Sequence, residues 1–160
     1  MTLQRNKLGG TSMDLESRMR VFENVYVGVL VDAVKYFSKE GILGKVSEDK
    51  RSEQMLLGRE KAKQFGIEKQ EEVFTRLSEI FNCSVWEISQ ESYGFSAETS
   101  ACKLCALDKR LSTESPCNIY CLDVMEGMVK GLVQNSKFVI KETLWCGRKC
   151  KIDVINHSAG

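Results

Sequence analysis

The chain has 160 residues, enough for one domain with its own hydrophobic core and too few for two domains of ordinary size. Hydrophobic residues make up 42% and charged residues 28% of it, as in an ordinary globular protein. The 23 basic and 22 acidic residues leave a net charge of +1, which gives no electrostatic basis for binding nucleic acid or an anionic membrane.

No apolar run approaches the roughly 20 residues that span a bilayer. Residues 1–13 also lack the apolar stretch of a signal peptide. We therefore expect a cytoplasmic protein with a flexible leader over residues 1–13 and a single domain over residues 14–156.

The first half of the chain has the spacing of helices. From Asp14, a candidate N-cap, apolar residues recur every three or four positions as far as Gly41, which predicts one long amphipathic helix. Its expected apolar stripe comprises Met19, Phe22, Tyr26, Val29, Leu30, Ala33, Val34 and Phe37. The length of this stripe leaves room for a homodimer. Further helices are expected over residues 48–65 and 68–81, the first of them ending at Gly66.

The second half reads β-β-α-β-β. Alternating residues predict strands over 84–89 and 93–101, and residues 106–114 read as a loop. Ser115 and Pro116 then start a helix that runs to about residue 133. Strands over 137–145 and 149–155 follow, joined by a tight turn at Gly147. These elements predict an α+β fold in which the N-terminal helices pack on a small antiparallel sheet.

Cysteine is the unusual feature of the composition. Six of the seven cysteines fall between residues 102 and 150, in three close pairs: Cys102 and Cys105, Cys117 and Cys121, and Cys146 and Cys150. In a reducing compartment such pairs favour metal ligation or thiol chemistry over disulfides. Cys83 stands alone, close to the apolar residues Phe81 and Val85, and is expected to be a small core residue.

Element lengths predict that the three pairs meet. The helix after Pro116 advances roughly 24 Å at 1.5 Å per residue. The strand that follows returns roughly 30 Å at 3.3 Å per residue, so the hairpin tip comes back level with the start of the helix. Cys117 and Cys121 are four residues apart and share one helical face there. Cys102 and Cys105 close the preceding strand, so all three pairs are expected at one end of the domain.

Three uses of this cluster stay open. Four of the sulfurs could hold zinc or an iron–sulfur cluster, with Cys102, Cys105, Cys117, Cys121, Cys146 and Cys150 as candidate ligands. Cys117, at a helix N-terminus, could instead have a lowered pKa and act as a nucleophile. Asp108 and Asp123 are the candidate general acid–base groups beside it. The third use is packing in the core.

Four segments carry a resemblance to a known family. They are LLGREKAKQFG, CKLCALD, SPCNIYCLDVMEGMVKGL and KETLWCGRKCKIDV, and together they resemble the L-2-amino-thiazoline-4-carboxylic acid hydrolases over roughly residues 20–155. The recurring family elements fall on Cys102, Cys117, Cys121, Asp123, Thr143, Leu144, Gly147 and Cys150. The resemblance implies hydrolysis of a small cyclic amidine in a sulfur-containing ring. This chain has more cysteines than the family pattern, Cys105 and Cys146 among them.

The closing strand pair is also similar to four-vinyl-reductase domains and Golgi transport-particle subunits, a resemblance that implies a small apolar ligand. Two functions therefore follow as expectations. One is a hydrolase-like enzyme for a small molecule. The other is a module without chemistry of its own that binds a metal or senses a small ligand.

Overall fold

The structure is a computed structural model that describes residues 12–156. Three helices come first: α1 (Leu15–Lys39), α2 (Leu43–Gln64) and α3 (Gln70–Phe81). The strands β1 (Glu87–Glu91) and β2 (Gly94–Thr99) follow, and then the short helix α4 (Lys103–Arg110). A π-helical turn, η1 (Asn118–Leu122), leads into α5 (Asp123–Leu132), and β3 (Lys137–Glu142) and β4 (Cys150–Ile155) complete the order.

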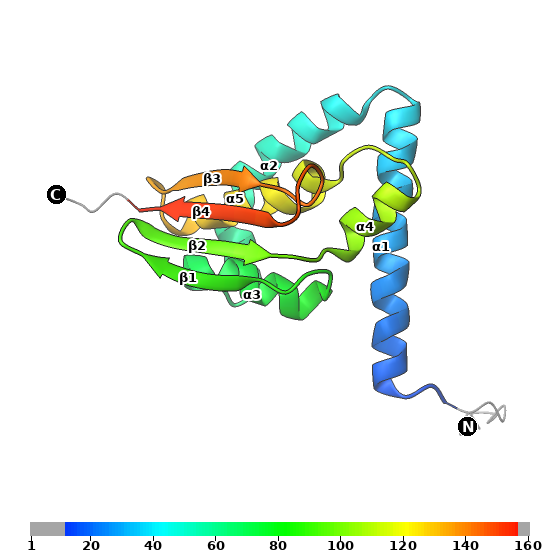
Figure 1. Cartoon of the computed structure of the whole chain (residues 1–160), viewed down its shortest axis with the longest axis horizontal. Helices are drawn as coiled ribbons and strands as arrows, with labels where there is room; N and C mark the ends of the chain where they lie inside the picture. The colour runs from blue at the N-terminus through cyan, green and yellow to red at the C-terminus, as the bar shows by residue number, and fades with distance from the viewer. Residues whose placement is uncertain (1–11, 157–160) are drawn as a thin grey trace, which may run out of the picture.

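The four strands form one antiparallel sheet in the order β1-β2-β4-β3. Phe95 is paired with Val154 and Ala97 with Ile152, so their side chains share the face on which α3 and α5 lie (Figure 1). Phe74 of α3 packs edge-on against Phe95 and Trp86. Burial of this apolar layer is the main source of stability, at about 25 cal/mol per Å². The α+β architecture with an antiparallel sheet matches the sequence prediction.

The helices α2 and α5 approach each other closely because glycines face each other across the contact. A Cβ atom on Gly58 would collide with the backbone of Gly127, and one on Gly127 would collide with the backbone of Gln54. Arg51 of α2 reaches across to α5, where it forms ion pairs with the buried carboxylates of Asp123 and Glu126.

The apolar stripe predicted for α1 is largely wrong. The residues of α1 that are buried are Val27, Val31 and Val34, of which only Val34 belonged to the predicted stripe. The remaining members of that stripe are exposed or half-buried, with Phe22 and Val29 among the exposed ones. The helix therefore has two neighbouring apolar faces, and the sequence pattern does not tell which of them packs on the domain.

Several element boundaries also differ from the prediction. The segment predicted as a loop over 106–114 contains most of α4, which caps on Cys102. The tight turn predicted at Gly147 is a longer loop over residues 143–149, because β3 ends at Glu142. The first predicted strand lies three residues later, at Glu87–Glu91.

The predicted leader lies outside the described residues except for Ser12 and Met13, which precede α1 without regular structure. Among residues 12–156, no helix combines the length and the apolar character needed to cross a membrane.

Candidate functional site: a cysteine-lined groove

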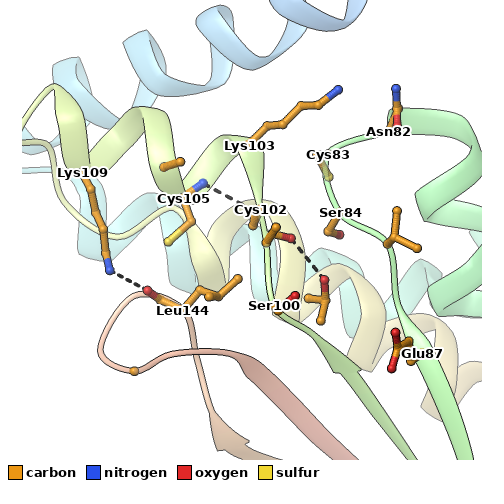
Figure 2. A pocket seen from close by; sticks show the side chains of 15 residues that line it. Asn82, Cys83, Ser84, Glu87, Ser100, Cys102, Lys103, Cys105, Lys109 and Leu144 are labelled. Atoms are coloured by element: carbon orange, nitrogen blue, oxygen red, sulfur yellow. Dashed lines mark hydrogen bonds between the residues drawn. The ribbon is translucent and has the colours of Figure 1, made fainter.

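An open groove of about 720 Å³ lies at the end of the sheet where β2 leads into α4 (Figure 2). Its walls come from the segment before β1, the start of α4 and the loop between β3 and β4. The lining residues are Asn82, Cys83, Ser84, Val85, Glu87, Thr99, Ser100, Ala101, Cys102, Lys103, Cys105, Ala106, Lys109, Leu144 and Gly147. This volume is in the range of small-molecule sites.

Cys102 has the most polar surroundings of the sulfurs in this wall. It is the N-cap of α4, and its Sγ accepts the backbone N–H of Cys105 at 3.5 Å. Cys83 lies beside it, because the N–H of Lys103 donates to the Cys83 carbonyl oxygen at 2.8 Å. The neighbouring Cys83 side chain lowers the pKa of Cys102 to about 6, with help from the backbone N–H groups of Cys105 and Leu104 and against the effect of burial.

The Cys102 side chain in turn raises the pKa of Cys83, and burial adds to the effect. Of the two sulfurs, that of Cys102 is the one whose ionisation the fold favours, because only Cys102 is the N-cap of a helix. The sequence reading of Cys83 as an isolated core residue missed this contact, since nothing in the sequence indicates that residue 83 lies against residue 102.

Behind the groove lies a second, nearly closed cavity of about 20 Å³, with room for one water molecule. Five cysteines line it: Cys102, Cys105, Cys117, Cys121 and Cys150. The buried Trp86 also lines it, and its indole N–H has no hydrogen-bond partner among the described residues. The cavity shares Cys102 and Cys105 with the groove, so the two spaces meet at the start of α4.

The structure thus brings together five of the six cysteines expected to meet. Cys117 and Cys121 lie next to and within η1, and Cys150 begins β4, where its Sγ accepts the N–H of Leu144 at 3.2 Å. Cys146 lines neither cavity and is exposed. Its position follows from the long loop between β3 and β4, because a tight turn would have held residue 146 beside the strand.

The lowered pKa expected for Cys117 is contradicted. Burial raises the pKa of this thiol, and the Ser115 hydroxyl only partly offsets the effect. Burial likewise raises the pKa of Cys121 and Cys150, and that of Cys105 to about 12. Burial therefore favours the neutral thiol at these four positions, and the sulfur whose ionisation is favoured is that of Cys102.

Of the two candidate carboxylates, only Asp108 lies near the cysteines. It is buried on α4, it accepts the Thr113 hydroxyl through Oδ1, and its Oδ2 has no hydrogen-bond partner among the described residues. Burial raises its pKa, and its charge in turn opposes ionisation of Cys102. Asp123 lines neither cavity and is paired with Arg51, so it does not join the cysteine cluster.

Two lysines of α4 line the groove and were missed by the sequence reading. The Lys103 ammonium lies 3.5 Å from Glu23 of α1, and the Lys109 ammonium donates to the Leu144 carbonyl oxygen at 2.6 Å (Figure 2). Because Lys103 is paired with Glu23, Lys109 is the groove lysine without a carboxylate partner among the described residues, and Glu87 adds one negative charge to the lining. Most of the segment around Lys103 and Lys109 was predicted to be a loop, and a predicted loop does not indicate which way its side chains point.

The arrangement does not form a ready metal site. Within residues 12–156, no three side chains of the His, Cys, Asp and Glu types are grouped so that they could hold one metal ion. The clustered sulfurs are mostly buried neutral thiols, whereas metal ligation requires thiolates.

The fold and the groove define a small α+β protein with a polarised cysteine in an open pocket. Comparison with protein families, curated proteins and solved structures finds no match for this chain. The resemblance to the aminothiazoline carboxylate hydrolases therefore stays a hypothesis.

Proposed function

We propose that this protein binds a small anionic molecule in the groove and acts on it through the Cys102 sulfur. The observation that carries the proposal is the position of Cys102, which stands in the wall of the groove, at the N-cap of α4 and next to the segment that contains Cys83. A thiolate held in this way is the reactive form of cysteine. Lys109 supplies positive charge for a carboxylate on the ligand, since the charge of Lys103 is already paired with Glu23.

The family resemblance supports a cyclic amidine as the substrate class. The Cys102 thiolate forms a bond to the amidine carbon, the bond from that carbon to the ring sulfur breaks, and the leaving sulfur takes a proton from solvent. Water then attacks the carbon attached to Cys102, the bond between this carbon and Cys102 breaks, and the thiolate returns with release of one proton. The net reaction adds one water molecule and opens the ring.

The test is to incubate the pure protein with 2-aminothiazoline-4-carboxylate and to follow ring opening by mass spectrometry. Cys102→Ser should abolish turnover, whereas Cys117→Ser, the matched control on a buried thiol, should retain it. No turnover by the native protein, or equal turnover by the Cys102→Ser variant, would refute the proposal.

Asp108→Asn gives a further comparison, because this carboxyl is buried and does not line the groove. We expect this variant to keep its activity. A loss of activity in a folded Asp108→Asn protein would assign the carboxyl an acid–base role that the structure does not require.

Metal binding is the second candidate, and the observation that favours it is the set of five sulfurs around one small cavity. Zinc or an iron–sulfur cluster would need these sulfurs to move and to lose protons, because they do not form a ligand group as they stand. Elemental analysis of protein purified without oxygen decides this question. Stoichiometric zinc or iron that is lost in the Cys121→Ser variant would support the metal, and protein free of both would reject it.

A further inference from the structure

The helix α1 has a second apolar face that is largely exposed. Its members are Leu15, Met19, Phe22, Tyr26, Val29, Ala33 and Tyr36, and they follow one another in alternating steps of four and three residues. Only Tyr26 among them stacks on an aromatic ring of another described element, Phe81 of α3, and it is still 42% exposed. This is the a/d spacing of a heptad repeat. Leu15 is 72%, Phe22 58% and Val29 60% exposed, values that are high for large apolar residues lying along one stripe.

The position of α1 explains why this face stays open. Val27, Val31 and Val34 attach the C-terminal half of the helix to the domain, with α4 alongside. The N-terminal half extends past α4 and away from the sheet (Figure 1). Few residues hold α1 on the domain, and an amphipathic helix is stabilised mainly by packing rather than by its intrinsic propensity. Covering the second apolar face would therefore stabilise α1 further.

We propose that this face is the interface of a homodimer, in which two copies of α1 pair in antiparallel orientation. A heptad stripe is complementary to itself, and here large and small residues can be matched. If Phe22 packs against the partner's Tyr26, then Met19 packs against the partner's Val29. The same register places Leu15 against the partner's Ala33, and the two-fold axis repeats each pair.

The charges beside the stripe select the same register. Arg18 and Asp32 are both exposed, and each precedes an a residue of the heptad, Met19 or Ala33, so both are g positions. In an antiparallel pair of helices, the g positions of one helix face the g positions of the other. In this register Arg18 lies opposite the partner's Asp32, so two ion pairs form across the axis. A shift by one heptad instead places Arg18 opposite the partner's Lys39, which is repulsive. On the other side of the stripe, Glu23 is already neutralised within its own copy by Lys103.

The available area is sufficient. In this register Tyr36 lies beyond the paired stripe, so Phe22 and Tyr26 are the aromatic residues that count; each is about half exposed and can bury roughly 100 Å² more. With the four smaller residues, each copy can bury roughly 500 Å², or about 1,000 Å² in total, which is about the minimum for a specific interface. The expected assembly is therefore a dimer of moderate affinity.

Sedimentation equilibrium or light scattering of the full chain between 1 and 100 µM (about the range for such an interface) tests this proposal. The native protein should reach twice the 18.1 kDa chain mass as its concentration rises. Phe22→Glu combined with Val29→Glu should remain monomeric with an unchanged circular dichroism spectrum. Leu56→Glu is the matched control, because it places the same charge on an exposed apolar residue of α2, and it should dimerise normally.

A native protein that is monomeric at 100 µM (roughly the upper end of that range), or a double variant that still dimerises, would overturn the proposal. The orientation is tested separately. Arg18→Asp should weaken dimerisation roughly ten-fold, and adding Asp32→Arg should restore it. Failure of the second change to restore the dimer would reject the antiparallel register. None of these variants lies in the groove, so the outcome is independent of the proposed function.

Discussion

Replacement of Gly127 by alanine should destabilise the protein, whereas the same replacement at Gly28 should stabilise it. Both glycines lie in the interior of a helix, Gly127 in α5 and Gly28 in α1. A Cβ atom on Gly127 would stand 2.8 Å from the carbonyl carbon of Gln54 and closer still to its oxygen. A Cβ atom on Gly28 would have no atom within 4 Å.

The expected magnitudes follow from this contrast. Alanine favours a helix over glycine by roughly 1 kcal/mol at either position. At Gly127 the obstacle is the backbone of α2, which cannot rotate away as a side chain could, so the two helices must separate. Overpacking of this kind costs typically 1–3 kcal/mol and occasionally more, and we place this case at about 3–4 kcal/mol because the contact is with backbone. The net loss at Gly127 is then about 2–3 kcal/mol, against a gain of up to about 1 kcal/mol at Gly28.

Thermal and urea unfolding followed by circular dichroism, at one fixed protein concentration, measures both effects. For a chain of this size 1 kcal/mol corresponds to roughly 3 °C, so Gly127→Ala should lower the Tm by about 6–9 °C and Gly28→Ala should raise it by up to about 3 °C. Holding the concentration constant matters because dimerisation would also shift the Tm. A Gly127→Ala variant as stable as the native protein would refute the close approach of α2 and α5.

Arg51→Ala should lower the free energy of unfolding by about 1–2 kcal/mol at pH 8, a discounted figure because Arg51 is half exposed. Urea titrations should show a somewhat smaller loss near pH 4, because burial raises the pKa of Asp123 and this partner takes up its proton first, whereas the pKa of Glu126 is lowered by its ion pairs with Arg51 and Lys130 and this carboxylate keeps its charge to lower pH. An equal loss at both pH values would mean that the arginine acts by packing alone. Burial raises the pKa of Asp108, so keeping this carboxyl ionised lowers the stability of the folded protein at pH values above the pKa of an ordinary aspartate. Asp108→Asn should therefore be more stable than the native protein at pH 8 and no more stable near pH 4. Iodoacetamide at about pH 6.5, just above the pKa of about 6 for Cys102, should modify Cys102 faster than the buried thiols, as peptide mass mapping would show. Cys83→Ala should slow this modification, and unchanged labelling in that variant would contradict the effect of Cys83 on the pKa of Cys102.

The convergence of the cysteines could be predicted because it depends on lengths alone. Helix rise and strand rise are nearly constant, so the return of β3 to the start of η1 and α5 follows from counting residues. The chemistry of each sulfur could not be predicted in this way. Cys117 does stand at a helical start, but its sulfur packs inward, and desolvation outweighs the favourable helix end.

The surroundings of Cys102 depended on two facts that no local pattern contains. One is that the chain becomes helical at Lys103, which makes Cys102 an N-cap. The other is the backbone hydrogen bond between Lys103 and Cys83, which joins segments twenty positions apart in the sequence. The face of α1 was misassigned for a related reason: two apolar stripes lie side by side on that helix, and only the tertiary contacts decide between them.

The strand order has a consequence for the way the chain folds. β4 lies between β2 and β3 and is paired with both, yet it follows them in the chain. During synthesis β1 and β2 can pair as soon as they emerge, but β3 has no neighbour until β4 is made. The apolar side chains of Phe95 and Phe138 must therefore wait for Val154, their common partner in the paired register, before the sheet closes. Late closure over non-local pairings slows folding and leaves two unpaired strand edges open to other chains in the meantime.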